Sequence, residues 1–381
     1  MNLVLDVETT KFPNALPWIP GSYLVSIHSY GRHGPKSWLF NHPESTQSQK
    51  DIIKEVQDEV DKSSRIIGHN IKFDLHWLTH IGICFDRVLL YDTLVAEYIL
   101  RNFQRLEGLS LDKLCEHYHV PSKLDKVKLH WDSGYDTDEI PADILIPYGE
   151  QDCLSTYHVY SKQVPQITNP TYMSLEMEVI RDLQEAEYNG LLLDTQLLEQ
   201  YRTDYDHRIT QLDREMEELL GEDLNLSSGQ QLSAALYGGS YDVDGVETIT
   251  KTLKSGEVKE YTRKCKQTIT IEGLGINPLP DSETKKEGVY RTDAETISQL
   301  KADTSAGKKF LTLYQERAKL STMNKTFFNG LLERAGEDSY VHPTLNQTVT
   351  RTSRLSSSNP NGQNFPRGGT GPVKQAFITR Y

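Results

Sequence analysis

Two acidic side chains stand at the end of the first apolar run of the chain. Residues 3–5 are Leu-Val-Leu, and they lead directly into Asp6-Val7-Glu8. In a strand, side chains at positions i and i+2 point to the same face, so Asp6 and Glu8 lie side by side. Two carboxylates this close repel each other unless a cation lies between them, and hard oxygen ligands suit Mg²⁺ or Mn²⁺. The pair indicates either a metal site or a strand end with two solvated acids.

A third carboxylate follows a second apolar run. Residues 65–70 predict a buried strand that continues into Ile71-Lys72-Phe73-Asp74. Between the two runs, 23–30 and 36–41 predict further strands and 45–62 predicts an amphipathic helix. Strands that alternate with helices indicate an α/β layer, in which functional groups gather at strand ends. Asp74 is therefore expected beside Asp6 and Glu8.

A helix that opens near Pro147 supplies the last two candidate groups. Proline suits the first turn of a helix, and Tyr148 and Asp152 are spaced i, i+4, so they share one face. A phenol beside a carboxylate can orient a water molecule while the acid completes a metal site. Asp74 and Asp152 taken singly are more often a helix-start acid and a solvated helix acid. The ordered set D-x-E, N-x-x-F-D and Y-x-x-x-D is much less common by accident.

These three segments resemble the three exonuclease motifs in the proofreading domain of family A DNA polymerases. That domain belongs to the exonucleases of the DEDD type, which have a ribonuclease H-like fold. The resemblance implies two divalent metal ions, Mg²⁺ or Mn²⁺, held by Asp6, Glu8, Asp74 and Asp152. It also implies that Tyr148 aligns the attacking water, and that Thr9, Asn70 and Phe73 contact the terminal nucleotide. The expected activity is metal-dependent 3′–5′ hydrolysis of DNA.

Composition sets broad limits on the chain. A length of 381 residues predicts about two to three domains. No apolar run approaches the length of a membrane span, and Met1 stands too close to the first strand for a leader peptide. The four cysteines have no C-x-x-C spacing, which predicts free thiols in a reducing cytosol. We expect a cytoplasmic protein of a bacterial or phage-infected host cell, with no membrane partner.

Charge is unevenly distributed along the chain. The net charge of −13 argues at first against a nucleic-acid partner. Residues 341–381 nevertheless hold no Asp or Glu and five basic residues, namely Arg351, Arg354, Arg367, Lys374 and Arg380. A basic, polar end on an acidic body is consistent with phosphate binding, and the alternative is a charged tail without a partner.

Long helices dominate the middle of the chain. A helix over 173–189 ends at Gly190, and Asp194 can cap the next helix. In that next helix the apolar residues step by threes and fours, which predicts a helix-pairing surface: Leu198, Tyr201, Tyr205, Ile209, Leu212, Met216 and Leu219. These helices, with the stretch that follows them, resemble the family's thumb, whose antiparallel helices contact the DNA minor groove. The resemblance implies DNA contacts from Asn225, Ser227 and Ser228.

A β-rich insertion is predicted at about 238–291. The runs 248–253 and 258–264 alternate around Lys254-Ser255-Gly256-Glu257, a hairpin pattern, and helix returns at a capping box over 292–295. The sequence assigns no function to the insertion. Its lysines either contact phosphate or form a solvated face: Lys251, Lys254, Lys259, Lys264 and Lys266.

Two stretches after the insertion resemble polymerase motifs of the same family. A helix over 308–335 holds Ala318-Lys319-Leu320-Ser321-Thr322, which resembles K-L-x-S-T-Y but lacks one residue and has Met323 in place of Tyr. Residues 350–366 resemble T-x-T-G-R-L-S-S-x-x-P-N-L-Q-N-I-P, with Ser353 in place of Gly and Gly362 in place of Leu. A polar, turn-rich loop is the alternative. The resemblance implies primer-template contacts from Lys319, Arg354, Asn361, Gln363 and Asn364, and such side chains read minor-groove acceptors that every base pair offers.

The expected architecture is α/β, with three regions. Residues 1–165 form a ribonuclease H-like exonuclease domain with a mixed sheet, 166–340 form a mainly helical thumb with the insertion, and 341–381 form an incomplete palm segment. The expected partners are a primer-template duplex and a single-stranded 3′ end of DNA. The resemblance is to phage-type members of family A, and it stops before the polymerase aspartate motifs.

The sequence therefore predicts a proofreading exonuclease that needs a second polypeptide, carrying the remaining palm and fingers, for DNA synthesis; a truncation is the alternative. Few apolar residues lie in 341–381, and we expect them to be uncovered and to attract that partner: Phe365, Val373, Ala376, Phe377 and Ile378. Two other functions remain open: a stand-alone DEDD-type exonuclease, and a non-catalytic DNA-clamping subunit with a dormant exonuclease fold.

Overall fold

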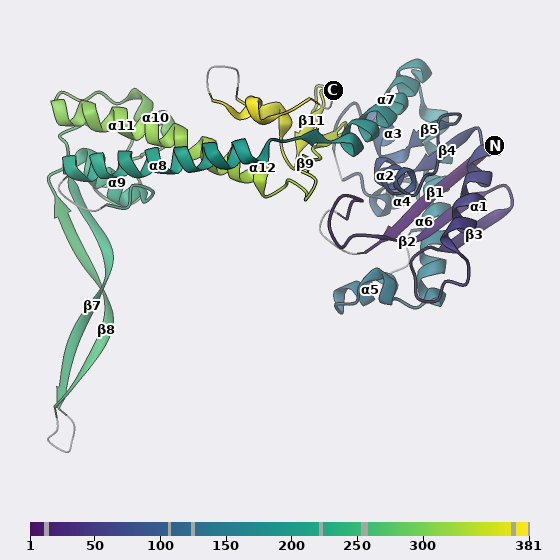
Figure 1. Cartoon of the computed structure of the whole chain (residues 1–381), viewed down its shortest axis with the longest axis horizontal. Coiled ribbons are helices and arrows are strands. Elements are labelled where there is room, and N and C mark those ends of the chain that lie inside the picture. Colours follow the sequence, from purple (N-terminus) through teal and green to yellow (C-terminus); the bar gives the residue numbers. More distant parts are fainter. Residues whose placement is uncertain are drawn as a thin grey trace. The chain divides into compact units, whose positions relative to one another are not determined.

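The structure, a computed structural model, describes residues 1–10, 15–105, 108–122, 126–220, 224–252, 258–366 and 371–379. Its contacts divide the chain into two compact units (Figure 1). The first unit comprises Met1–Asp194 and Arg334–Tyr381, and the second comprises Thr195–Glu333. These units do not coincide with the predicted boundaries at 165 and 340, because the helix after 165 packs on the first sheet and the chain returns to that unit after 333.

A five-stranded mixed sheet forms the centre of the first unit, as predicted. The strands are β1 (Asn2–Thr9), β2 (Leu24–Gly31), β3 (Gly34–Leu39), β4 (Arg65–Gly68) and β5 (Leu89–Asp92), in the order β3-β2-β1-β4-β5. β1 pairs antiparallel with β2 and parallel with β4. The central position of β1 buries both of its faces, and this explains its continuous apolar run.

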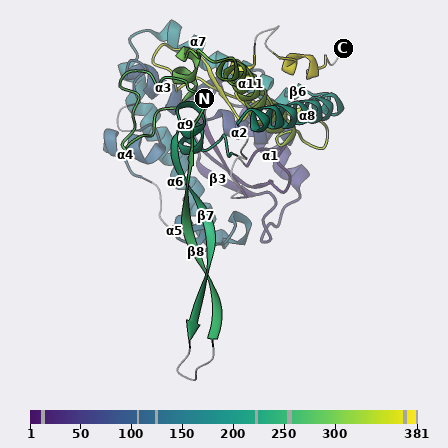
Figure 2. The ribbon, with the colours of Figure 1, turned by 90° about the vertical axis from the view of Figure 1, so that its left-hand side faces the viewer.

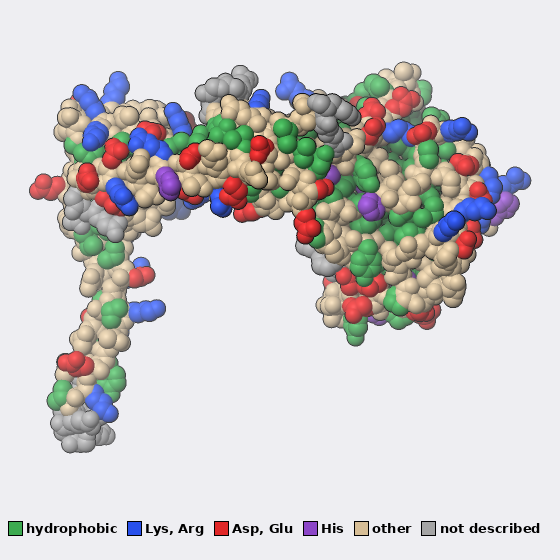
Figure 3. All heavy atoms as spheres, in the orientation of Figure 1, with side chains coloured by type: hydrophobic (Ala, Val, Ile, Leu, Met, Phe, Trp, Pro, Cys, Tyr) green, Lys and Arg blue, Asp and Glu red, His purple; other side chains and the backbone are tan. Residues whose placement is uncertain are grey.

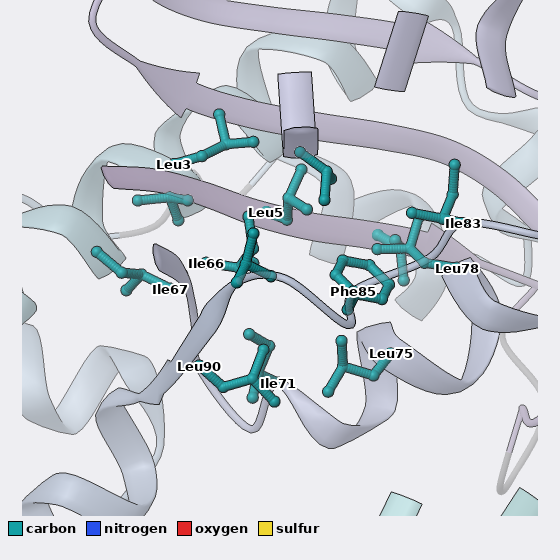
Figure 4. Close-up of a cluster of buried hydrophobic side chains, with 14 of the residues drawn as sticks. Leu3, Leu5, Ile66, Ile67, Ile71, Leu75, Leu78, Ile83, Phe85 and Leu90 are labelled. Carbon is teal, nitrogen blue, oxygen red and sulfur yellow. The ribbon is translucent and has the colours of Figure 1, made fainter. Parts of the chain in front are cut away.

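The helices of the first unit pack on the sheet or on one another. They are α1 (Gln49–Asp61), α2 (Lys72–His80), α3 (Thr93–Leu100), α4 (Leu111–Tyr118), α5 (Lys126–Asp132), α6 (Ala142–Gln163) and α7 (Pro170–Asn189), with 3₁₀ turns at Thr137–Glu139 and Val164–Gln166. The side chain of Ser48 caps α1, four residues into the predicted helix. Figure 4 shows the core between β1, β4 and α2, where Leu5, Ile66 and Leu75 are among the buried side chains.

Helix α6 begins earlier than the sequence predicted. Pro147 lies inside the helix rather than in its first turn, because Ala142 and Leu145 are buried and extend the helix toward its N-terminus. Proline has no N–H to donate within the helix. Two residues later, Gly149 permits close packing on β2, since a Cβ atom there would lie 2.2 Å from the ring of His28.

The last segment of the chain completes the first unit. β6 (Leu191–Leu192) pairs with β9 (Tyr340–Val341), and β10 (Thr344–Asn346) pairs with β11 (Ser356–Ser358), while 3₁₀ turns span Gly362–Asn364 and Val373–Ala376. A bridge joins Leu193 to Phe377. The expectation of uncovered apolar residues is therefore wrong for Val373 and Ala376, which are fully buried, whereas Ile378 is exposed.

Two long helices build the second unit. α8 (Thr195–Leu220) packs against α11 (Ser305–Thr322), and the other elements are α9 (Gly229–Tyr237), α10 (Ala294–Gln299), a π-helical segment (Met323–Asn329) and α12 (Gly330–Leu332). The predicted seam of α8 does pair helices: Leu212 and Met216 are buried, and Tyr205 meets the ring of Phe328. Asp293 caps α10 through the N–H of Thr296, so the predicted capping box at Thr292 is wrong.

The predicted insertion is a two-stranded hairpin longer than the sequence indicated. β7 (Gly239–Thr252) and β8 (Val258–Ile271) pair over their whole length, and Figure 2 shows the twist of this ribbon. The predicted turn at 254–257 lies outside the described residues. Basic and acidic side chains both lie along the hairpin (Figure 3), as in the pair Glu247–Arg263. Within the described part of the chain, no helix is both long and apolar enough to cross a membrane.

Candidate metal and nucleotide site

Three of the four predicted metal ligands meet at one end of the sheet. Carboxylate oxygens of Asp6, Glu8 and Asp152 all lie within 4.8 Å of one another. Asp6 and Glu8 come from β1 and Asp152 comes from α6, which packs along β1 and β2. Glu8 and Asp152 are buried and Asp6 is half-buried. The i, i+2 spacing in β1 therefore does place two acids together, and α6 brings the third.

Asp74 joins this group through the main chain of β1. The N–H of Val7, the residue between Asp6 and Glu8, donates to Oδ1 of Asp74 at 2.9 Å. Asp74 is buried, and burial together with the neighbouring charge of Asp6 raises the pKa of its carboxyl well above the ordinary value, although the bond from Val7 opposes this rise. We call Asp6, Glu8, Asp74 and Asp152 the acid cluster.

Cys153 lies in the electrostatic field of the whole acid cluster. Burial raises the pKa of its thiol well above the ordinary value, and the charges of all four acids raise it further. The pKa of the buried Cys153 thiol therefore depends on the charges of all four acids: Asp6, Asp152, Asp74 and Glu8. Cys153 was predicted only as a free thiol, although its place directly after Asp152 already indicated a neighbour of one acid.

The donor set of the acid cluster fits a hard divalent cation. Four carboxylates supply oxygen ligands of the kind that Mg²⁺ and Mn²⁺ prefer. Neighbouring carboxylates disfavour full ionisation in the absence of a cation, and the charge of Asp6 adds to the effect of burial in raising the pKa of Asp74. The residues present therefore fit the divalent metal that the resemblance implies.

Tyr148 lies one turn before Asp152 on α6. Its side chain is 5% exposed and packs with Val25, Val127, Ile140 and Leu145, and its ring meets Trp131 edge-on with centroids 5.9 Å apart. The apolar packing restricts the rotamer of Tyr148, so the position of its hydroxyl is defined by the core.

Two of the predicted nucleotide contacts line a common hollow. Asn70 and Phe73 both border a space of about 380 Å³ on the first unit. Asn70 has φ +58°, a left-handed conformation that is uncommon outside glycine. Thr9 ends β1, where its hydroxyl donates to the carbonyl of Thr10 at 3.4 Å.

Asp92 holds Asn70 in this conformation, and sequence reasoning missed it. Its Oδ1 accepts the N–H of Asn70 at 2.9 Å and its Oδ2 accepts that of Ile71 at 3.0 Å. Asp92 also caps α3 by accepting the N–H of Leu94 at 2.8 Å. Burial raises the pKa of this carboxyl to about 6, against the lowering effect of these backbone bonds. A strand that ends in Asp before an apolar helix was the available signal.

The predicted duplex contacts divide between the two units. In the second unit, Asn225 accepts the N–H of Ser227 at 3.0 Å, Ser228 caps α9, and Lys319 is an exposed residue in the last turn of α11. Asn225 and Ser228 thus have a local structural role at the start of α9.

In the first unit, the predicted contacts are all exposed: Arg354, Asn361, Gln363 and Asn364. Asn361 accepts the N–H of Gln363 at 3.1 Å, and the Gln363 side chain donates to the carbonyl of Leu355 at 3.0 Å. Ser353, which stands where the polymerase motif has Gly, has φ +56°. Ser353 therefore adopts a left-handed backbone conformation of the kind that favours glycine, although its side chain is that of serine.

Comparison with known proteins agrees with this organisation. Residues 36–168 match the sequence model of a family described as 3′–5′ exonuclease, and 262–381 match that of DNA polymerase family A. The first match includes Asp74, Tyr148 and Asp152, and the structure brings Asp6 and Glu8 to them from outside it. One region of the chain is therefore similar to 3′–5′ exonuclease domains, and another is similar to part of DNA polymerase family A.

Individual relatives are bacterial DNA polymerases I. The chain is 28% identical over 339 residues to that of Synechocystis sp., covering 85% of this chain and 29% of the relative. It is 24% identical over 389 residues to that of Pseudomonas aeruginosa, covering 99% of this chain and 38% of the relative. The chain thus spans well under half of the length of these relatives.

A solved structure shows the same fold. The POL domain of Pol1 from M. smegmatis, in complex with DNA primer-template and dNTP, aligns with a TM-score of 0.65 and 20% identity. The alignment covers 99% of this chain and 54% of that chain. These relatives are bacterial, and the expected phage-type affiliation stays a prediction.

Proposed function

We propose that the chain is a metal-dependent 3′–5′ exonuclease that removes nucleotides from a single-stranded or frayed 3′ end of DNA. The observation that carries the proposal is the acid cluster, in which carboxylate oxygens of Asp6, Glu8 and Asp152 lie within 4.8 Å of one another and Val7 ties Asp74 to the same strand. The match of 36–168 to the 3′–5′ exonuclease family supports it.

Each residue of the site has a role in this proposal. Asp6, Glu8, Asp74 and Asp152 would hold divalent metal ions, which would lower the pKa of the attacking water and stabilise the leaving 3′ oxygen. Tyr148 orients that water, since the core fixes its ring one turn from Asp152. Asn70 and Phe73 hold the terminal nucleotide in the hollow that they line.

The direct test is hydrolysis of a 5′-labelled single strand in Mg²⁺. The expected product is a ladder that shortens from the 3′ end and disappears with EDTA. Asp6→Ala should lower the rate by several orders of magnitude, because it dismantles a metal site. Asp58→Ala, which removes an exposed acid of α1, is the matched control and should leave the rate unchanged. Equal rates for wild type and Asp6→Ala would falsify the proposal.

The finer expectations about the whole protein extend this proposal. We propose that the exonuclease proofreads for DNA synthesis by a family A polymerase, with Lys319, Arg354, Asn361, Gln363 and Asn364 on the primer-template duplex; the match of 262–381 supports this. The dependence on a second polypeptide stays a prediction, which co-purification and primer extension with a chain that carries the aspartate motifs can test. A cytoplasmic location also stays a prediction, and the four cysteines form no disulfide.

A further inference from the structure

Asn70 lies between two adjoining hollows of the first unit. One has a volume of about 380 Å³ and the other of about 810 Å³, each within the range of about 300–1,000 Å³ that small-ligand sites have. Five residues line both hollows, so the two are continuous: Asn70, Leu94, Asn346, Thr348 and Ser358. The hollow that holds Phe73 therefore does not end at the terminal nucleotide site.

One face of the β10–β11 hairpin forms a wall of this space. The register pairs Thr344 with Ser358 and Asn346 with Ser356, and paired residues of antiparallel strands point to the same face. All four side chains border at least one of the two hollows. The wall therefore presents a row of hydroxyl and amide groups from a segment some 270 residues away from Asn70 in the sequence.

The hairpin is fixed to three helices of the first unit, one of which, α2, carries Phe73 and Asp74. The carboxylate of Glu187 accepts the N–H of Leu345, and the ammonium of Lys72, next to Phe73, donates to the carbonyl of Leu345. On the far side, the Tyr98 hydroxyl donates to the carbonyl of Thr350 at 2.6 Å. Because α2, α3 and α7 all hold it, the wall keeps a defined distance from Asn70.

We propose that this space is the path of the single strand, and that Thr348, Asn346, Ser356 and Ser358 contact the sugar-phosphate backbone of the nucleotides 5′ to the terminal one. Serine, threonine and asparagine side chains donate to phosphate and sugar oxygens without reading sequence, as an exonuclease that acts on any strand requires. Arg105 and Asp112 both line the larger hollow, so its charge is balanced and the neutral groups make most of the contacts. This inference rests on the proposed exonuclease function.

A pair of charge substitutions at Thr348 tests the path. Thr348 borders both hollows, is half-buried and lies beyond the paired residues of β10, so either charge can be placed there with the hairpin intact. With an octanucleotide, Thr348→Asp should raise KM roughly tenfold and Thr348→Lys should lower it, because a fixed charge near phosphates acts with opposite signs. With a dinucleotide, which leaves most of the path empty, both variants should differ from wild type by less than about twofold.

Thr352→Asp and Thr352→Lys are the matched controls, since Thr352 is an exposed residue of the same connection and borders neither hollow. They should behave as wild type on both substrates. Ser356→Asp and Ser356→Lys repeat the test from the larger hollow if a Thr348 variant melts early. Equal changes with the dinucleotide and the octanucleotide, or shifts of the same sign for Asp and Lys, overturn the path. A wild-type protein that releases no nucleotide from either substrate instead refutes the proposed function itself.

Discussion

The N–H of Val7 donates to Oδ1 of Asp74 at 2.9 Å. Because Val7 stands between Asp6 and Glu8, this bond sets the distance of the α2 acid from the two acids of β1 through the main chain. The spacing of the acid cluster is thus built into the backbone rather than into flexible side chains, which favours a preorganised site.

Two substitutions at Asp74 separate its charge from its acceptor role. Asp74→Asn keeps an oxygen for Val7 and removes a buried charge, so it should abolish most hydrolysis and leave the melting temperature at or above that of wild type. Asp74→Ala also leaves the Val7 N–H buried without an acceptor, which costs about 1–3 kcal/mol. Thermal melts and the strand-shortening assay measure both effects. Equal melting temperatures for the two variants would contradict this role of the bond.

Much of this site could be predicted from the sequence because its elements are local. The i, i+2 pair in β1, the i, i+4 pair in α6 and the strand before Asp74 are short-range patterns, and all were recognised. Asp92 was missed, since its role depends on where β5 lies beside β4, a relationship that only the folded sheet defines.

The least predictable parts depend on long-range pairing. The predicted start of α6 was wrong. Burial of Ala142 favours an earlier start, and this outweighs the preference of Pro147 for the first turn of a helix. The pairing of β9 with β6 joins segments about 150 residues apart, and no local pattern specifies it. The burial of Val373 is likewise not indicated by its neighbours in the sequence. The predicted hairpin was shorter than β7 and β8, since Gly245 and the acids around it interrupt the apolar alternation of β7.

Divalent metal should stabilise the folded protein through the acid cluster. Binding to the folded state alone adds about 2.7 kcal/mol at a hundredfold excess over Kd. We expect Mg²⁺ or Mn²⁺ to raise the melting temperature, EDTA to reverse the rise, and NaCl at equal ionic strength to have no such effect. Asp6→Ala/Glu8→Ala should remove the response and Asp58→Ala should keep it. A full response in the double variant would place the ion elsewhere.

Tyr148→Phe should be milder than loss of a metal ligand. The ring keeps its packing against Leu145 and Trp131, so stability should change little, while the hydroxyl that we propose orients the water is lost. Loss of correct positioning costs about 10²-fold in rate. We expect a lower kcat at an unchanged metal-induced melting shift. A loss of that shift would instead assign Tyr148 to the metal site.

Arg354→Ala should separate duplex binding from hydrolysis. Arg354 is exposed and lies outside the acid cluster, so its loss should weaken binding to a primer-template and spare hydrolysis of a short single strand. A phosphate or minor-groove contact of this type is worth about 1–3 kcal/mol, or roughly ten- to a hundredfold in Kd. Fluorescence anisotropy with labelled duplex measures it, and Lys54→Ala, at an exposed basic residue of α1, provides the control. A proportional loss on both substrates would mean that Arg354 has a structural role.

His28 should make stability fall at mildly acid pH. Its ring is fully buried in β2 beneath α6, where Nε2 lies 2.8 Å from the Ser26 hydroxyl and Nδ1 lies 2.9 Å from that of Ser37. Burial lowers the pKa of this imidazole to about 3, against an ordinary value of about 6.5 in the unfolded chain. Between these values the unfolded state binds a proton that the folded state does not.

The free energy of unfolding is therefore unaffected by His28 protonation above about pH 6.5. It declines as the pH falls toward about 3, by up to about 1.4 kcal/mol per pH unit. Urea unfolding at pH 6.5, 5.5 and 4.5 measures this slope. His28→Asn should lower stability at every pH but flatten the slope relative to wild type, whereas His33→Asn, at an exposed histidine of the next turn, should leave it unchanged. An equal slope in wild type and His28→Asn would show that other groups account for the acid sensitivity.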